Sequence, residues 1–354
     1  MNKKLISLLL AVVMMVSLFS TTASAASSKK SSGKLPQFKT ITSLGDSASS
    51  GFGLDDYNKQ GKFVVYCTRI RGSYPDLVAK ELRATKLNQY AISGSRTTEL
   101  LYLLDNDFEP DYIMKEADEL ISEGQITLKK LKSLRPVYQK AVKESDMILL
   151  DVGFDDIWVP TIACIYDIAE DGRKYTDPDP ELTLRQKVAK YGSYEVVFQN
   201  AINYLAGFIG NPRKWAEYWI QWDETVLKWA TDFFINYNAI IDRIYELNPD
   251  VTVVSLGFYN PAESWSILPG DRSLEHSLQL YYDVINSTKQ KFEGVLPNYY
   301  YVEERNVEMI NNRATLPLYE NLTLDDSGFN PHPTYKGHKQ ITKLIIKKLK
   351  SVLL

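Results

Sequence analysis

Residues 38–47, FKTITSLGDS, decide the fold of this chain. An apolar run rich in β-branched residues predicts a buried strand over residues 38–44, and Gly45-Asp46-Ser47 predicts a turn at the strand's carboxyl end. In open sheets of parallel strands, ligands bind at this carboxyl edge. The serine of the turn, Ser47, is therefore the first candidate for a functional residue.

Short apolar runs alternate with longer helical patterns through the rest of the chain. We expect further strands at residues 87–92, 147–152, 251–256 and 299–302, and helices at residues 74–84, 98–104, 128–144, 233–247, 274–292 and 335–352. This alternation predicts an α/β fold with three layers, α/β/α, in which helices cover both faces of a parallel sheet of about five strands.

Three further motifs lie at strand ends or before the last helix. They are Ala91-Ile92-Ser93-Gly94, Gly153-Phe154-Asp155-Asp156 and Asn330-Pro331-His332-Pro333. The first two follow predicted strands, as the Ser47 turn does, and the carboxyl ends of parallel strands meet at one edge of the sheet. We therefore expect these motifs to lie together, with Asp46, Phe154 and Trp158 binding the substrate.

Ser47 and His332 supply the residue types of a nucleophilic site. A serine hydroxyl is a poor nucleophile at neutral pH and needs an adjacent base. Of the three histidines, His276 lies in a charged helical stretch and is expected at the surface. His338, at the start of the last helix, is expected to pack or cap. We therefore predict that Ser47 is the nucleophile and His332 its base.

These motifs, taken together, resemble those of the SGNH/GDSL hydrolase family of secreted esterases, lipases and carbohydrate deacetylases, over about residues 40–345. The resemblance implies a flavodoxin-like sheet and an acyl-enzyme intermediate on Ser47, with no cofactor or metal. It also implies an oxyanion hole formed by the backbone N–H groups of Ser47 and Gly94, with a third donor at Asp155. The triad would be completed by Asn330.

Two positions depart from the family pattern. The third donor is an asparagine in the family, whereas an ionised Asp155 only accepts hydrogen bonds and would repel an oxyanion. A protonated Asp155 could still donate, or Asp155 and Asp156 could bind a cation or a cationic substrate group. Asn330 stands where the family has an aspartate; it can orient the histidine but lacks a charge. Asp325 or Asp326 could take that role instead, or a Ser–His dyad could suffice.

The N-terminus and one internal segment differ from the α/β pattern. Residues 1–25 are typical of a signal peptide, and residues 26–36 of a flexible linker, which leaves a domain over residues 37–354. Residues 158–231 contain no clear strand and are predicted to be a helical insertion. Its tryptophans include Trp215, Trp219, Trp222 and Trp229. They could form a cap over the active site or the insertion's own core.

Composition and cysteine usage narrow the function. The net charge is −3 with dispersed basic residues, and no Gly-x-Gly-x-x-Gly follows a strand, so neither nucleic-acid nor dinucleotide binding is indicated. Cys67 and Cys164 are predicted either to form a disulfide after export or to remain two buried thiols. We expect a secreted, monomeric serine esterase that acts on a small-molecule, lipid or glycan ester without stable membrane insertion. The alternative is a catalytically impaired relative that binds an acylated glycan or peptide.

Overall fold

The computed structural model describes residues 35–60, 66–110, 126–158, 212–260, 273–304, 307–311 and 330–354, with a few isolated residues between 161 and 190. For residues 212–225, 273–275, 311 and 330–331 it describes the backbone alone. The predicted signal peptide lies outside these ranges, as does most of the linker.

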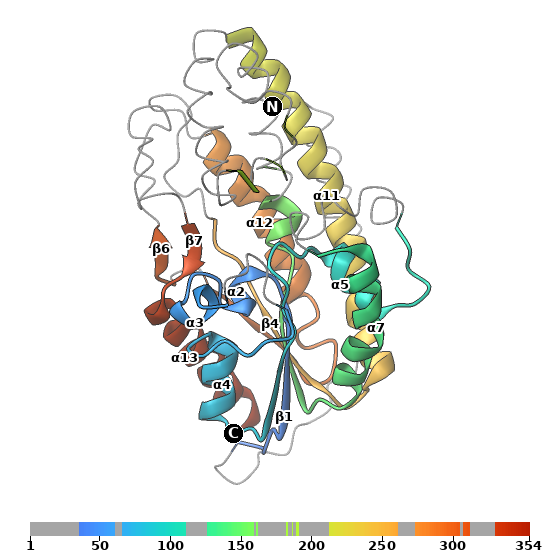
Figure 1. Ribbon diagram of the computed structural model, residues 1–354, viewed down its shortest axis with the longest axis vertical. Coiled ribbons are helices and arrows are strands. Elements are labelled where there is room, and N and C mark those ends of the chain that lie inside the picture. The colour runs from blue at the N-terminus through green and yellow to red at the C-terminus, as the bar shows by residue number, and fades with distance from the viewer. Residues whose placement is uncertain are drawn as a thin grey trace.

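Five parallel strands form the central sheet in the order β2-β1-β3-β4-β5 (Figure 1). Their bounds are β1 Thr40–Gly45, β2 Lys86–Gln89, β3 Met147–Asp151, β4 Thr252–Leu256 and β5 Tyr299–Val302. This is the flavodoxin-like order, in which β2 is added on one side of β1, whereas β3 and the later strands are added on the other side. The predicted three-layer α/β fold is confirmed.

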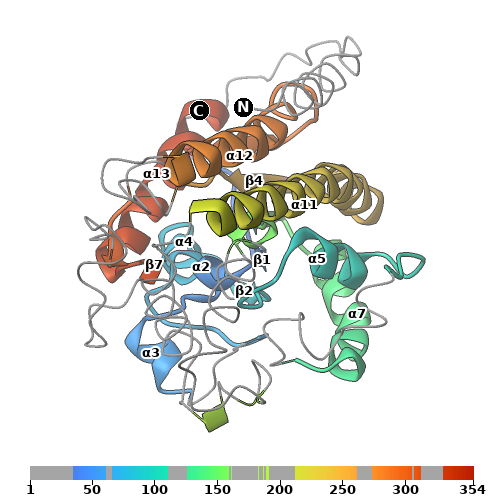
Figure 2. The ribbon, with the colours of Figure 1, turned by 90° about the horizontal axis from the view of Figure 1, so that it is seen from above.

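Helices cover both faces of this sheet (Figures 1 and 2). One face carries α4 (Tyr74–Glu81) and α13 (Tyr335–Leu353), which pack against each other. The other carries α5 (Thr97–Leu104), α7 (Leu128–Lys143), α11 (Pro212–Leu247) and α12 (Ser273–Gln290). Two short helices, α2 (Ser47–Ser50) and α3 (Asp55–Asn58), and a small antiparallel pair, β6 (Met309–Asn311) with β7 (Asn330–Pro333), complete the described elements.

Each strand divides its side chains between two apolar cores. In β3, Leu149 belongs to the core beneath α4 and α13, whereas Ile148 belongs to the opposite core. This is the period of two that a pleated strand imposes. Helix α13 buries Ile341, Ile345 and Leu349, a spacing of four residues that places them on one helix face.

Helix α11 extends further than the sequence indicated. The predicted helix began at residue 233, whereas α11 begins at Pro212. About the last quarter of the predicted 158–231 insertion is therefore continuous with a helix of the domain core. Trp229 lies on this helix, 4.2 Å from the guanidinium carbon of Arg96. The side chains of the other three tryptophans lie outside the described part of the chain.

Two further expectations can be compared with the structure. Cys67 is a free thiol and is exposed rather than buried, whereas Cys164 lies outside the described residues. The backbone of Cys67 itself has a positive φ of 52°. None of the described helices combines the length and apolar character that crossing a membrane requires.

Candidate active site

The end of strand β1 is fixed to the end of β3 by close backbone contact. A Cβ atom on Gly45 would lie 2.1 Å from the Asp151 carbonyl oxygen, so a side chain at Gly45 cannot be accommodated. The next residue, Asp46, donates its N–H to that same oxygen at 3.1 Å. This packing sets the position from which the Ser47 turn leaves the sheet.

Ser47 is the first residue of the short helix α2. Asp46 caps the helix, and its carboxyl accepts a hydrogen bond from the Ala48 N–H at 3.1 Å. Gly51 ends the helix in the left-handed region, at a φ of 80°, where a glycine is favoured. The strand, the capped turn and the helix together hold Ser47 at the carboxyl edge of the sheet.

His332 reaches Ser47 from the other end of the sequence. It lies in β7, two residues before Thr334, whose side chain caps α13 by accepting the Gly337 N–H at 3.0 Å. The Nε2 atom of His332 is 2.8 Å from Ser47 Oγ, a hydrogen bond that joins positions 285 residues apart. The structure therefore brings together the predicted nucleophile and base.

The imidazole of His332 is neutral at physiological pH. Burial lowers its pKa to about 3, with a smaller contribution in the same direction from His338. A neutral ring can use Nε2 to accept the Ser47 proton, as a general base requires. The face of this ring lies against Phe52, with the two ring centroids 4.3 Å apart.

Hydrogen bonds tie the Ser47 helix to the turn that contains Gly94. Ser50 Oγ donates to the Ser47 carbonyl at 2.9 Å and lies 3.0 Å from Ser93 Oγ. Ser93 Oγ is in turn 2.8 Å from the Tyr57 hydroxyl. Gly94 itself has a positive φ of 74°, which turns the chain directly beside these contacts. The two proposed backbone donors of the oxyanion hole therefore belong to loops that are held together.

The turn after β3 is fixed by a buried carboxyl group. Asp156 accepts hydrogen bonds from both the N–H, at 2.8 Å, and the hydroxyl of Thr97, the first residue of α5. A Cβ atom on Gly153, which has a φ of 121°, would lie 2.5 Å from the Phe233 ring. Asp156 is thus an anchor between two loops, and Gly153 permits the turn to pass under α11.

Asp155 is buried in a manner that favours its neutral form. Its Oδ2 atom has no hydrogen-bond partner within the described residues. Burial, together with the neighbouring charges of Asp156 and Glu99, raises the pKa of Asp155 to about 8. A carboxyl group with this pKa is protonated at pH 7 and can donate a hydrogen bond.

Lys289 is a buried lysine whose charge interacts with buried carboxyl groups, including that of Asp151 at the end of β3. Asp151 Oδ2 accepts hydrogen bonds from Ser49 Oγ at 3.1 Å and from the Tyr74 hydroxyl at 3.0 Å. Lys289 is fully buried, and its Nζ donates to the Leu256 carbonyl at 2.7 Å. Burial lowers its pKa to about 8, against the opposing effect of Asp151 and other carboxyls. Sequence reasoning missed Lys289, because a lysine in an amphipathic helix normally faces solvent.

The residues predicted to bind substrate lie deeper than expected. Asp46 is buried as the cap of α2. Phe154 and Trp158 are nearly buried, with ring centroids 6.0 Å apart, and both belong to an apolar core. These contacts assign all three a packing or capping role, and substrate binding by them stays a prediction.

The other predicted residues are placed as follows. His276 is exposed, as expected. His338 is buried and accepts the Tyr74 N–H at Nδ1, 3.1 Å away, so it caps the start of α4. Asn330 is a residue of β7 whose side chain is outside the described part, and Asp325 and Asp326 lie outside it entirely. No group of three or more ligating side chains among the described residues is arranged to hold a metal ion.

Comparison with known proteins gives similarity of structure only. The chain matches no protein-family model and no curated protein. The extracellular lipase of Streptomyces rimosus is 15% identical, with a TM-score of 0.42, and the alignment covers 88% of this chain and 99% of that one. Phospholipase A1 of Streptomyces albidoflavus NA297 is 14% identical, with a TM-score of 0.42, and the alignment covers 88% of this chain and 99% of that one. A family 3 carbohydrate esterase of Clostridium thermocellum is 12% identical, with a TM-score of 0.37, and the alignment covers 89% of this chain and 96% of that one. These values are too low to assign a family or an activity, so function is inferred from the site itself.

Proposed function

We propose that this chain is a serine esterase of the SGNH/GDSL type, which cleaves a carboxylic ester through an acyl-enzyme intermediate. The observation that carries the proposal is the 2.8 Å contact between Ser47 Oγ and His332 Nε2. The contact lies where the carboxyl end of β1 meets β7, at the edge where parallel sheets bind ligands. A neutral histidine within hydrogen-bonding distance of a helix-borne serine is the arrangement that activates a hydroxyl.

The proposed reaction proceeds in two steps. His332 accepts the Ser47 proton as Oγ attacks the ester carbonyl, and the resulting imidazolium then gives that proton to the departing alcohol. Water, activated by the same histidine, hydrolyses the acyl-Ser47 ester and releases the carboxylic acid. The backbone N–H groups of Ser47 and Gly94 are proposed to stabilise the oxyanion, each by about 3 kcal/mol.

Asp155 is proposed as the third donor to the oxyanion, in its protonated form. Burial of this carboxyl supports the role, because its Oδ2 atom, which has no hydrogen-bond partner among the described residues, gains from donating to a developing negative charge. The neutral form also removes the repulsion that an ionised aspartate would exert. An aspartate would then serve where an asparagine serves in the family that the sequence resembles.

The substrate is proposed to be a small-molecule, lipid or glycan ester outside the cell. Residues 1–25 have the charged start, apolar run and small-residue cleavage site of an export signal, which supports a secreted location. Neither the acyl group nor the alcohol is specified by the described residues. No cofactor is needed for the proposed chemistry.

Hydrolysis of p-nitrophenyl acetate by the purified mature chain tests the proposal. Ser47→Ala and His332→Gln should each abolish turnover, whereas Ser133→Ala, which alters an exposed serine of α7, should leave it unchanged. A fluorophosphonate probe should label the wild type and the Ser133→Ala variant but not Ser47→Ala. Absence of labelling at every pH tested would reject the catalytic proposal and favour a non-catalytic binding protein.

A further inference from the structure

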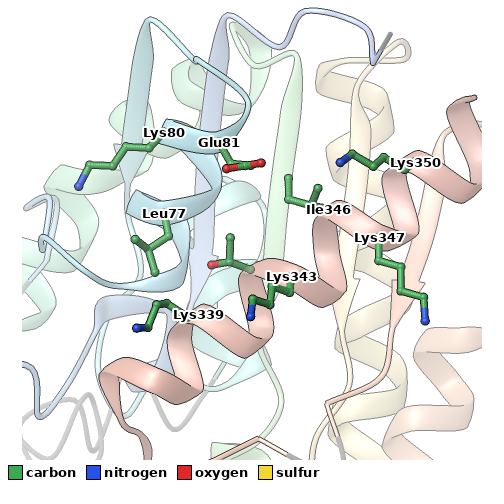
Figure 3. Close-up of a pocket in the computed structure, with 9 residues that line it drawn as sticks. Leu77, Lys80, Glu81, Lys339, Lys343, Ile346, Lys347 and Lys350 are labelled. Carbon is green, nitrogen blue, oxygen red and sulfur yellow. The ribbon is translucent and has the colours of Figure 1, made fainter. Parts of the chain in front are cut away.

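A groove lined by lysines runs between α4 and α13, separate from the Ser47 site (Figure 3). Its volume is about 690 Å³. The groove is lined by Leu77, Lys80, Glu81, Lys339, Thr342, Lys343, Ile346, Lys347 and Lys350. Five of these nine residues are lysines and one is acidic, although the chain as a whole carries a net charge of −3. Positive charge is thus concentrated on this face.

Four of these lysines have no salt-bridge partner in the part of the chain that the structure describes. They are Lys339, Lys343, Lys347 and Lys350, and all four are exposed. Two other lysines of α13 do form salt bridges. Lys336 pairs with Glu308, and Lys348 pairs with Glu293 at 2.5 Å. Lys80, across the groove, is bound to Asp76 at 2.6 Å.

The unpaired lysines repeat along one side of the helix. Lys339, Lys343 and Lys347 are spaced at four residues, so neighbouring charges are about 6 Å apart along the axis. Like charges at this spacing destabilise a helix. The fold does not require them either, since the apolar face of α13 supplies its packing through Ile341 and Ile345. A row of repelling charges that packing does not explain points to a ligand that neutralises it.

We propose that this groove binds a linear phosphate-bearing polymer. A polymer with regularly spaced anionic groups can contact several of the lysines at once, and such multivalent contact strengthens weak individual interactions. A single phosphate ion could reach only one or two of the ammonium groups. The floor formed by Leu77 and Ile346, with Thr342 between the lysines, gives the polymer backbone a shallow, partly apolar bed.

The shape of the groove favours a polymer over a membrane surface. A helix that lies on a membrane inserts an apolar face between lipids. The apolar face of α13 is already buried against the sheet and α4, and the lysines surround a concave surface. No aromatic ring lines the groove, so nothing there would stack on the bases of a nucleic acid. The ligand is therefore recognised by its charge and not by bases.

The groove leads towards the candidate active site. Lys339 lies five residues after Thr334, which caps α13 directly beyond His332. A polymer held along α13 would thus have one end directed at the edge of the sheet that carries Ser47. Binding in the groove does not depend on the proposed hydrolysis, so the two can be tested separately.

Fluorescence anisotropy of labelled long-chain inorganic polyphosphate measures the proposed binding. A variant in which Lys339, Lys343, Lys347 and Lys350 are all changed to Gln should bind at least about tenfold more weakly, and the slope of log affinity against log salt should flatten by about 3. The matched control changes four exposed lysines of α7 to Gln and thus alters the net charge equally. Those residues are Lys129, Lys132, Lys140 and Lys143. The control should weaken binding by about twofold at most.

Three results would overturn the proposal. They are no binding of polyphosphate by the wild type, an equal loss in the two quadruple variants, and binding to vesicles of anionic phospholipid in the absence of binding to polyphosphate. Should the groove variant fail to fold, as judged by its circular dichroism, the single change Lys343→Glu replaces it and should still weaken binding severalfold. Hydrolysis of p-nitrophenyl acetate is expected to be unchanged in every one of these variants.

Discussion

The ring of Phe52 lies against the imidazole of His332, with centroids 4.3 Å apart and planes inclined by 34°. The Phe52 N–H donates to the Ser47 carbonyl at 3.0 Å. The aromatic ring that covers the proposed base, His332, is therefore fixed to the residue that carries the proposed nucleophile. Tyr57 packs on Phe52 in turn, at 5.1 Å between centroids. This contact was not predicted, because the sequence places Phe52 in a glycine-rich turn with no chemical motif.

Replacing Phe52 with Leu should lower turnover. During the reaction His332 becomes positively charged, and the face of an aromatic ring stabilises a cation by about 1 kcal/mol. Leucine retains the apolar contact but not this electrostatic attraction, so kcat should fall about fivefold while KM changes little. Steady-state kinetics with p-nitrophenyl acetate measure both constants.

Phe52→Trp is the control for that experiment, since its ring presents a stronger quadrupole to the cation. Phe52→Trp should therefore have a higher kcat than Phe52→Leu. The pKa of His332 can also be followed by NMR, because the chain has only three histidines and the His332→Gln variant identifies the signal. A Phe52→Leu protein with unchanged kcat and an unchanged His332 titration would show that the ring only fills space.

The activity should persist into acid solution. A base must be unprotonated to act, and burial lowers the pKa of His332 to about 3, so kcat/KM should remain within about twofold between pH 7 and pH 5. The profile is measured with p-nitrophenyl acetate at a wavelength where protonation of the product does not alter the signal. An acid limb near the ordinary histidine value of about 6.5 would contradict the burial of this ring.

The kcat of Asp155→Asn should increase relative to the kcat of the wild type as the pH rises. The pKa of Asp155 is raised to about 8, so the wild-type carboxyl loses its proton, and with it the ability to donate, as the pH passes that value. An asparagine amide donates at every pH. The ratio of kcat for Asp155→Asn to that of the wild type should therefore increase from pH 7 to pH 9.

Asp155→Ala completes the comparison, since it removes the donor altogether and should reduce kcat about 100-fold. Burial also raises the pKa of Asp156, to about 7, so a decline at alkaline pH that survives in Asp155→Asn would be assigned to Asp156. A fall in activity at all pH values in Asp155→Asn would mean that the carboxyl itself is required.

Gly153→Ala should destabilise the protein and disturb the turn that carries Asp155. The new methyl group would lie 2.5 Å from the Phe233 ring, and overpacking of this kind costs about 1–3 kcal/mol in the free energy of unfolding. Gly294→Ala is a matched control, because Gly294 also has a positive φ but no atom lies within 4 Å of the added Cβ. Its cost should be limited to backbone strain of about 1 kcal/mol. Urea unfolding measures both values, and equal losses would refute the steric argument.

The sheet and the pairing of Ser47 with His332 were predictable because both leave strong local signals in the sequence. The strands are short apolar runs that end at polar turns, and this pattern indicated five strands and the edge where they end. Ser47 follows the first of them directly. His332 stands beside a residue that caps the last helix, Thr334, and thus at a helix boundary that the sequence also marks.

The contacts made by buried polar groups were not predictable. Nothing in the pattern around Lys289 distinguishes it from the exposed lysines of other helices, yet it is fully buried. The protonation of Asp155 depends on desolvation and on Asp156, both of which arise only when the turn packs under α11. The start of α11 was also placed about twenty residues late, because the tryptophan-rich stretch before residue 233 was assigned to a separate helical insertion.

The contact between Ser47 and His332 also bears on when the protein becomes reactive. Ser47 directly follows β1, whereas His332 comes after all five strands of the central sheet in sequence, with β7 and α13. Docking of Ile341, Ile345 and Leu349 against the sheet fixes the helix that follows His332. Under the proposed mechanism, a chain in which α13 has not yet docked would carry an unactivated Ser47, and proteolytic removal of α13 would abolish turnover without altering that residue.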